Sequence, residues 1–356
     1  MKKAGFIIGF FMIVFSFIGC DLFIASKVKP STPINVQLFD ETLTWDSSSL
    51  ADKYYIYADG EFIDETNETS FYFTSTITVD QNITVSAVSS EEGELLESSQ
   101  SGVIIRYKNS FSLSETMIFD FRNGFGEPYN NFLVINQNFE IDSNIRYVQI
   151  IGNTGDTYSD LSFHIANRNL PLQIDIENVK IEAKYDCSVI YSDAPLSGNY
   201  LVTINSLGSS NELYGGLIST TGSRGDDAEV LFAIGGDGGV GNQGVAAISL
   251  PRVLIKGSSD ILLEGGIGGI GGAGGNGKSN YGGDGGDGGT GGSGAEFIKL
   301  YVKLDDTTII TFIGGPGGEG GYPGNSTLLT SPSEGDFGEQ GEDYVGSLTL
   351  ISGIIG

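Results

Sequence analysis

The stretch GGIGGIGGAGGN, residues 265–276, repeats a glycine pair and one other residue with a strict period of three. GGDGGDGGTGGS at 282–293 and GGPGGEGGY at 314–322 repeat the pattern, and a shorter GGDGGV begins at residue 235. This period fits an extended helix with three residues per turn better than a flexible linker. Bare glycine edges let neighbouring backbones approach closely and pair their N–H and C=O groups. The pattern predicts a packed sheet of polyglycine II-type segments.

The third residue of each triplet differs in character between the stretches. Apolar residues, which we expect to face a core, fill this position in the first stretch: Ile267, Ile270 and Ala273. Polar residues, which we expect to face water, fill it in the second: Asp284, Asp287, Thr290 and Ser293. The predicted sheet therefore has an inside and an outside. A disordered glycine loop is the alternative, and it leaves this alternation unexplained.

The rest of the region from residue 111 onward has the texture of short β-strands. Apolar segments such as 147–151, 201–204 and 309–313 recur without helical periodicity and are separated by Asn, Asp, Ser and Gly. This is typical of a β-solenoid, whose coils stack around a narrow apolar core. We assign residues 108–356 to this glycine-rich domain. Residues 111–170 form either a separate β-sandwich or a cap, and the sequence does not decide between them.

Residues 230–350 resemble the glycine-rich segments of some bacterial surface proteins and phage adhesins. In that class, strand–GGx–GGx–strand units project from a β-helical stem. The resemblance implies a surface or adhesin role but does not specify a ligand.

Residues 34–107 show alternating short β segments and turns, which indicate a sandwich. They resemble a fibronectin type III domain. One feature departs from that pattern, because the tyrosine expected at the start of the sixth strand would fall near Gln81. The resemblance implies a spacer or binding adaptor rather than a catalyst. It rests on Pro33, Trp45, Tyr55-Ile56-Tyr57, the Asp59-Gly60 turn and Ser101.

The N-terminus has the form of an export signal, with Lys2 and Lys3 before an apolar stretch at 4–18. That stretch is too short for a comfortable bilayer span. It ends in Phe17-Ile18-Gly19-Cys20, which resembles the lipobox of bacterial lipoproteins. The resemblance implies cleavage after residue 19, lipidation of the Cys20 thiol and a tether over residues 20–33. An uncleaved anchor helix, or an ordinary signal with a chance cysteine, is the alternative.

Bulk composition limits the partners of the protein. The net charge of the 356-residue chain is −27, and removal of Lys2 and Lys3 would make it two units more negative. Nucleic acid and anionic surfaces repel such a protein. We expect membrane attachment through the N-terminal lipid, at the outer membrane or cell surface rather than the periplasmic face of the inner membrane. If Cys20 is acylated, Cys187 has no disulfide partner, and we expect it to be buried.

Two short motifs are candidate binding sites. Asp284 and Asp287 lie in GGDGGD, which partly matches a calcium-binding GGxGxD repeat. No cofactor is expected otherwise, and the triplet period explains the match without calcium. Arg224-Gly225-Asp226 is a tripeptide that animal integrins read, and we expect it on a loop.

Signals of catalysis are few. His164 is the only histidine, so histidine-based triads and HExxH metal sites are nearly excluded. A two-carboxylate glycosidase needs no histidine, and no acidic pair stands out. We therefore predict non-catalytic adhesion or recognition at the envelope, with a glycan or another cell-surface protein as partner. A carbohydrate-active enzyme on a β-helix (a polysaccharide lyase or glycosidase) and a purely structural envelope component are the alternatives.

Overall fold

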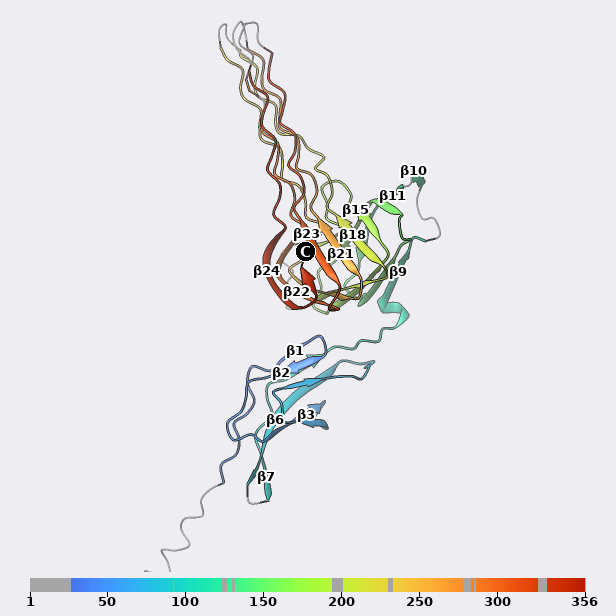
Figure 1. Cartoon of the computed structure of the whole chain (residues 1–356), viewed down its shortest axis with the longest axis vertical. Coiled ribbons are helices and arrows are strands. Elements are labelled where there is room, and N and C mark those ends of the chain that lie inside the picture. Colours follow the sequence, from blue (N-terminus) through green and yellow to red (C-terminus); the bar gives the residue numbers. More distant parts are fainter. Residues whose placement is uncertain are drawn as a thin grey trace, which may run out of the picture. The chain divides into compact units, whose positions relative to one another are not determined.

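A computed structural model describes residues 27–91, 93–122, 127–129, 132–193, 201–229, 233–277, 283–284, 286–325 and 332–355 (Figure 1). The chain divides into two compact units, Met1–Ser110 and Phe111–Gly356. Apart from one short 3₁₀ helix, η1 (Leu113–Glu115), the regular structure of the described residues consists of β-strands. The predicted all-β class is confirmed.

The first unit consists of two antiparallel sheets. One has three strands in the order β1-β2-β5, and the other has the order β4-β3-β6-β7 with β8 paired to β6. The bounds are β1 (Gln37–Phe39), β2 (Thr42–Thr44), β3 (Lys53–Ala58), β4 (Glu61–Thr66), β5 (Ser70–Tyr72), β6 (Gln81–Glu91), β7 (Glu94–Glu97) and β8 (Ile104–Arg106).

Alternating side chains build the core of this unit. In β3, Tyr54 and Ile56 are buried while their neighbours are half-buried, which is the period of a strand with one face on a core. Trp45 packs edge-on against Tyr54 with ring centroids 5.2 Å apart. Arg106 is buried as well, with its Nε 2.7 Å from a Glu41 carboxylate oxygen and its guanidinium 4.2 Å from the centre of the Phe73 ring. This charge is therefore both paired and covered.

The second unit contains the parallel strands. Their bounds are β9 (Thr116–Asp120), β10 (Glu127–Tyr129), β11 (Phe132–Ile141), β12 (Tyr147–Ile151), β13 (Thr157–Ile165), β14 (Leu172–Glu177), β15 (Lys180–Glu182), β16 (Ile190–Ser192), β17 (Val202–Leu207), β18 (Ser210–Tyr214), β19 (Ile248–Ser249), β20 (Arg252–Gly257), β21 (Asp260–Glu264), β22 (Ala295–Leu304), β23 (Ile309–Ile313), β24 (Tyr344–Ser352) and β25 (Ile354–Ile355). Except for the antiparallel pair β10–β11, the pairings between these strands are parallel.

The parallel strands stack in three columns. The chain adds strands to the columns in turn and then returns to the first column, and we call one such circuit a coil. The first column holds β9, β12, β14, β17, β20 and the second halves of β22 and β24. The second holds part of β13 and then β15, β18, β21, β23 and β25. The third holds the rest of β13, β16, β19 and the first halves of β22 and β24.

Ladders of apolar side chains fill the interior of the coils. Ile174, Ile204, Ile255 and Val302 are paired in register on four successive coils, and each is at most 1% exposed. Stacking of β-branched side chains on neighbouring strands is the packing that pleated sheets favour. The core of this unit is therefore a one-dimensional column, in which each coil is buried mainly by the coils before and after it.

The length of a coil changes abruptly partway along the unit. Leu172 of β14 pairs with Val202 of β17, thirty residues later, whereas Val202 pairs with Val253, fifty-one residues later. The extra residues lie after β18, β21 and β23, where the glycine triplets occur. In Figure 1 the chain leaves the coils at these three points and returns to them.

The described residues between positions 111 and 170 do not form a separate sandwich. They supply β9 and β12, which pair with each other and continue the first column into β14. They also supply β13, which bends between the second and third columns. These residues are the first coils of the second unit.

Candidate functional site: the glycine bundle and the cavity at its base

The glycine-rich insertions form six extended segments, which we call runs. Each insertion contributes two runs that travel away from the coils and back, and together they make the glycine bundle. Runs 1 to 6 are residues 215–229, 233–245, 265–277, 283–294, 314–325 and 332–343, with residue 285 outside the described part of run 4.

Run 3 shows how the runs are joined. The first glycine of a triplet donates its N–H to the third residue of a triplet in run 5, as Gly268 does to the Pro316 oxygen at 3.0 Å. The second glycine donates to run 2, as Gly272 does to the Gly239 oxygen at 2.7 Å. The same two bonds recur every three residues along the run. Runs 3 and 5 are parallel, whereas runs 3 and 2 are antiparallel.

These bonds arrange the runs in two layers. Runs 1, 3 and 5, which we call the odd layer, are linked by bonds such as Gly222 N–H to the Ile270 oxygen at 2.8 Å. Runs 2, 4 and 6, the even layer, are linked by bonds such as Gly288 N–H to the Asp336 oxygen at 2.8 Å. The second glycines of runs 2 to 5, and the single glycines of run 6, bond across the layers. The bundle is therefore a two-layer slab with a backbone interior.

Close backbone approach explains why these positions are glycine. A Cβ on Gly272 would lie 2.0 Å from the Ser223 oxygen, and one on Gly268 would lie 2.0 Å from the Gly289 oxygen. Real Cβ atoms do not approach a carbonyl oxygen this closely. None of the glycines of the described runs needs a positive φ, so the requirement is for space rather than for a left-handed backbone.

The number of glycines per triplet follows the number of neighbouring runs. Runs 3 and 4 each bond to four others and have two glycines in each triplet. Run 6 lies at one edge, bonds to runs 4 and 5, and keeps one glycine in three at Gly335, Gly338 and Gly341. Run 1 lies at the other edge and keeps Gly222 and Gly225 at the same spacing. An edge run has one open side, where a side chain fits.

The predicted inside and outside of the glycine region was wrong. Ile267 and Ile270 are 42% and 45% exposed, and Ala273 is half-buried, so these residues do not face a core. The interior of the slab has room for backbone only, and the third residue of a triplet therefore points outward whatever its polarity. Asp284, Asp287 and Thr290 are exposed, as expected. Ser293 is buried, because it lies at the foot of run 4 where the run rejoins β22.

The third residue also has an N–H that the two glycine bonds do not use. In several triplets an aspartate or asparagine of the previous coil accepts this N–H. The Asp284 carboxylate accepts from Ser333 N at 2.8 Å, and the Asp287 carboxylate accepts from Asp336 N at 2.9 Å. Asn276 accepts from Asn325 N in the same way. Asp284 and Asp287 thus satisfy backbone donors of the bundle.

Calcium at Asp284 and Asp287 stays a prediction. The described residues contain no group of three or more histidine, cysteine or carboxylate side chains placed to hold a metal ion. The hydrogen bonds above give both carboxylates a structural role that does not involve a metal.

The Arg224-Gly225-Asp226 tripeptide lies on run 1 rather than on a separate loop. A Cβ on Gly225 would meet the Gly236 oxygen at 2.0 Å, so the backbone here is packed against run 2. The Arg224 guanidinium donates to the Asp227 carboxylate at 2.5 Å, and that carboxylate accepts Asn276 N at 2.7 Å. Arg224 and Asp226 are both exposed on this rigid support. Integrin-type recognition remains untested.

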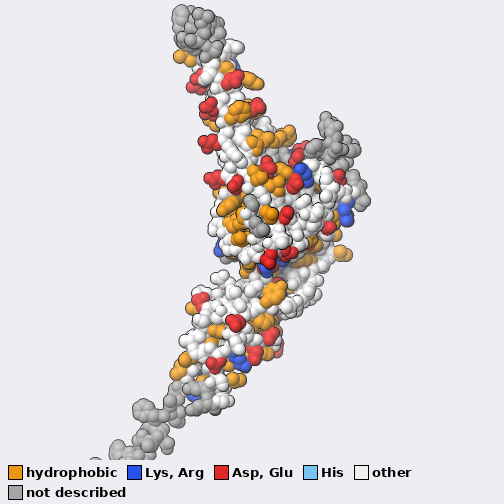
Figure 2. Space-filling view, in the orientation of Figure 1, with side chains coloured by type: hydrophobic (Ala, Val, Ile, Leu, Met, Phe, Trp, Pro, Cys, Tyr) orange, Lys and Arg blue, Asp and Glu red, His pale blue; other side chains and the backbone are white. Residues whose placement is uncertain are grey.

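Both layers expose apolar and acidic side chains, but in different proportions. Exposed residues of the odd layer include five apolar ones, interrupted by charged residues such as Glu319: Leu217, Ile267, Ile270, Pro316 and Tyr322. The even layer exposes three apolar residues, Ile234, Val240 and Phe337, together with these acidic ones: Asp237, Asp284, Asp287, Asp336, Glu339 and Glu342. Figure 2 shows a column of acidic side chains along the left margin of the bundle and hydrophobic ones over its front and right side.

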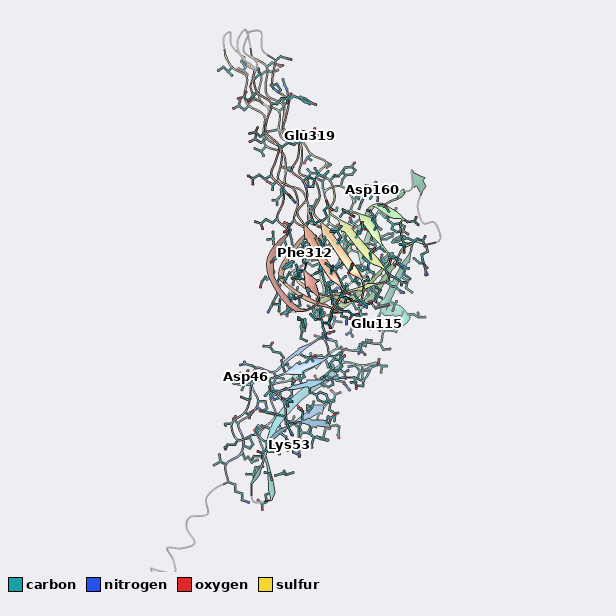
Figure 3. All side chains as sticks on the ribbon, in the orientation of Figure 1. Asp46, Lys53, Glu115, Asp160, Phe312 and Glu319 are labelled. Atoms are coloured by element: carbon teal, nitrogen blue, oxygen red, sulfur yellow. The ribbon has the colours of Figure 1, made fainter. Side chains whose placement is uncertain are left out.

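A cavity of about 470 Å³ lies where the odd layer meets the second column of strands. One wall comes from the feet of runs 1, 3 and 5, through Leu217, Ile267 and Pro316. The other wall comes from the strands and the turn after β15, and includes Asp160 of β13 and Tyr185 of that turn. Figure 3 shows Asp160 at the rim of the coils, below the level of Glu319 on the bundle. The remaining lining residues are Ser159, Glu182, Ala183, Tyr214, Gly215, Glu264, Gly265 and Gly266.

Strand register sets the spacing of the polar wall. Glu182 of β15 pairs with Tyr214 of β18, and Tyr214 pairs with Glu264 of β21. The residues before them on each strand, such as Leu213, are buried, so these three side chains point outward. Adjacent strands lie about 4.8 Å apart, and Glu182 and Glu264 are therefore roughly 10 Å apart at the backbone.

Burial and charge act on the ionisable groups of this wall. Burial, with a smaller effect of the neighbouring Asp160 carboxylate, raises the pKa of the Glu182 carboxyl above 4.5, while Lys180 opposes the shift. Burial and the hydrogen bond to Glu212 raise the pKa of Tyr214 to about 12. Asp160 has a φ of 55°, a left-handed conformation that aspartate tolerates better than most residues.

Two residues earlier on the same strands, the charges of Lys180 and Glu212 neutralise each other. Lys180 Nζ lies 2.8 Å from a Glu212 carboxylate oxygen and 5.1 Å from the centre of the Tyr214 ring. The Tyr214 hydroxyl donates to Glu212 at 2.7 Å. Among the described residues, the side chains of Asp160, Glu182 and Glu264 form no ion pair or hydrogen bond. The cavity thus presents three unpaired carboxylates beside an apolar wall.

The predicted lipidation residue Cys20, the predicted cleavage residues Phe17, Ile18 and Gly19, and residues 20–26 of the predicted tether lie outside the described residues. In the described part of the chain, no helix has the length and apolar character needed to cross a bilayer. Cys187 is half-buried rather than fully buried. His164 lies on β13, where its Nδ1 is 2.5 Å from a Glu140 carboxylate oxygen.

Sequence reasoning missed the cavity residues, although the sequence holds a signal for them. Each long coil has a strand that ends directly before a glycine pair: LYGG at 213–216, LEGG at 263–266 and FIGG at 312–315. The residue directly before the glycine pair is Tyr214, Glu264 or Ile313. These three residues are paired with one another on successive strands of the second column, and their side chains point away from the core. These residues are 50 and then 49 positions apart, which is the coil repeat counted along the second column.

No family model, curated protein or solved structure matches this chain.

Substitution of Gly272 tests the backbone interior of the bundle. Gly272→Ala places a Cβ against the Ser223 oxygen, and we expect it to destabilise runs 1 to 4 by about 2–4 kcal/mol. Hydrogen exchange of the glycine amides measures this as lost protection. Ala273→Ser, on the next residue, points outward and should change protection by less than about 0.5 kcal/mol. Equal protection in both variants would contradict the arrangement.

The pH dependence of stability tests the environment of Glu182. A carboxyl whose pKa is raised in the folded protein stabilises fully below its unfolded pKa, and this contribution is lost as the pH rises through the folded value. Glu182→Gln should therefore raise the free energy of unfolding at pH 7, by less than about 1 kcal/mol because the side chain is partly solvated. The gain should disappear below about pH 4. A variant less stable than wild type at pH 7 would contradict the assignment.

Proposed function

We propose that this chain is a lipid-anchored bacterial envelope protein that uses the glycine bundle as a non-catalytic recognition element. In this proposal Cys20 carries the lipid and a fibronectin type III-like unit serves as a spacer. The second unit is a β-solenoid, and its six runs are polyglycine II-type helices. The antiparallel sheets of the first unit and the parallel columns of the second support these assignments.

One observation carries the recognition role: the interior of the bundle is backbone, so its outward side chains contribute little to holding it together, apart from the aspartates and asparagines that accept backbone N–H groups. Such side chains are free to vary for binding, as on loops held by a rigid scaffold. The odd layer uses this freedom to expose Ile270 and Tyr322, the latter 72% accessible. Exposed apolar groups on a rigid support are typical of binding surfaces.

A carbohydrate-active enzyme is the second candidate, and the cavity favours it. Glycosidases use two carboxyl groups, one of them an acid with a raised pKa. Glu182 has a raised pKa and shares the cavity with Asp160 and Glu264. Release of reducing sugar that Glu182→Gln abolishes would support this candidate over non-catalytic recognition.

Protease treatment of intact cells tests the anchored surface location. Wild-type protein should be digested from outside, and Cys20→Ala should be released from the membrane fraction without lipid. Cys187→Ala, which changes the other cysteine of the chain, should behave as wild type. Protection of the wild type from external protease would rule out a surface role.

Paired surface variants test which layer binds. Ile270→Ser with Tyr322→Ser removes two apolar groups from the odd layer and leaves its glycines in place. We expect at least a tenfold loss of binding to whichever glycans or matrix proteins an array shows to be bound by the full-length protein. Val240→Ser removes an exposed apolar side chain from the even layer and should have no effect. Equal losses from both layers would argue against recognition by the odd layer.

A further inference from the structure

The cavity at the foot of the odd layer combines an apolar wall, an exposed tyrosine and a row of hydrogen-bond acceptors. We propose that it binds an uncharged sugar unit of a polysaccharide. This inference deepens the proposed recognition function by naming a ligand class and a site, and it rests on that function only for its location at the envelope.

The walls match the two kinds of surface on a sugar ring. Leu217, Ile267 and Pro316 form the apolar side, and Tyr185, 53% exposed, adds an aromatic surface. A pyranose has C–H faces that pack against such groups, and its edges carry hydroxyls. A ligand with only apolar groups would leave the carboxylates of the opposite wall without partners, which is unfavourable on desolvation.

The polar wall of the cavity has more hydrogen-bond acceptors than the protein has donors to pair with them. Asp160, Glu182 and Glu264 each present two carboxylate oxygens when ionised, and within the described residues these oxygens have no hydrogen-bond donors from the protein. Hydroxyl groups of a sugar donate to such oxygens in charge-assisted bonds, which are stronger than bonds between neutral groups. A ligand rich in hydroxyl donors is therefore the chemical complement of this wall.

The charge of the cavity excludes acidic sugars. None of the residues that line it is lysine or arginine. Lys180, two residues before Glu182 on β15, is held by Glu212. A uronic acid, sulfated or phosphorylated sugar would bring a negative charge against three carboxylates, at a cost that no cation of the lining offsets. The sugar unit is therefore uncharged.

The geometry suits a chain of sugars rather than an isolated one. Glu182, Tyr214 and Glu264 lie on three successive coils, so polar groups recur about every 4.8 Å along the coil axis. A polysaccharide lying along this axis would present hydroxyls to each of them. Because paired strands and bonded glycine runs form most of the walls, the site is formed before binding, which lowers the entropy cost of association.

Calorimetric titration of the full-length protein tests the site. The probes are uncharged hexose oligomers (of glucose, galactose and mannose), galacturonate oligomers, glucosamine oligomers and spermidine. We expect at least one uncharged oligomer to bind, and galacturonate oligomers not to bind. Tyr185→Ala and Glu264→Ala should each weaken binding at least tenfold. Glu319→Ala, which removes an exposed glutamate outside the cavity, should bind as wild type. Unfolding of each variant is followed in parallel, so that loss of fold is not read as loss of binding.

Three results would overturn the proposal: no uncharged oligomer binds, only glucosamine oligomers or spermidine bind, or binding is unaffected by the cavity variants. If one of these three results is obtained, and the protein is still digested by protease on intact cells, the sugar site is refuted but the proposed surface recognition function is not. Binding in the cavity by a protein protected from external protease supports the sugar site and refutes the surface location. Cleavage of the bound oligomer supports the site and identifies the protein as the enzyme of the second candidate.

Discussion

The second unit depends on one constraint, the close approach of bare backbones in the glycine bundle. Each run satisfies its glycine N–H groups with carbonyl oxygens of its neighbours, at distances such as 2.7 Å between Gly272 N and the Gly239 oxygen. A methyl group at that position would overlap the Ser223 oxygen. Because the bundle is held by main-chain bonds and excludes side chains from its interior, it needs no hydrophobic core. The coils below it are built in the opposite way, with ladders such as Ile204 on Ile255 in their centre.

The glycine bundle and the coils with an apolar core occur in one chain because both follow the same coil repeat. Each long coil adds one pair of runs after the second-column strand, so stacking of the coils also stacks the runs. The Asp260 carboxylate accepts Ile309 N on the coils, and Asn276 accepts Asn325 N on the bundle, both across 49 residues. The register of the apolar core therefore fixes the register of the glycines. The cavity arises at this junction, where outward side chains of the strands face the feet of the odd layer.

The proposed function depends on the side chains that the backbone interior leaves without a structural role. In a hydrophobic core, the side chains that stabilise the fold are not available for binding. In the bundle, third residues of triplets such as Ile270 and Thr290 are exposed to solvent and form no part of the backbone interior. The aspartates are the exception, because Asp284 and Asp287 accept backbone N–H groups of the next coil. The outward side chains without a structural role can therefore change their chemistry without changing the backbone that supports them.

The sequence by itself determined the all-β class and the positions of the glycine segments, because a period of three and short apolar runs are local patterns that need no knowledge of the fold. It did not determine which way Ile267 points, since its polarity suggested a core and only the two-layer packing leaves no interior room for it. The grouping of Asp160, Glu182 and Glu264 was also decided by tertiary structure, because residues on different coils meet only when the coils stack. Local pattern specified the elements, and the shared register of coils and runs specified the site.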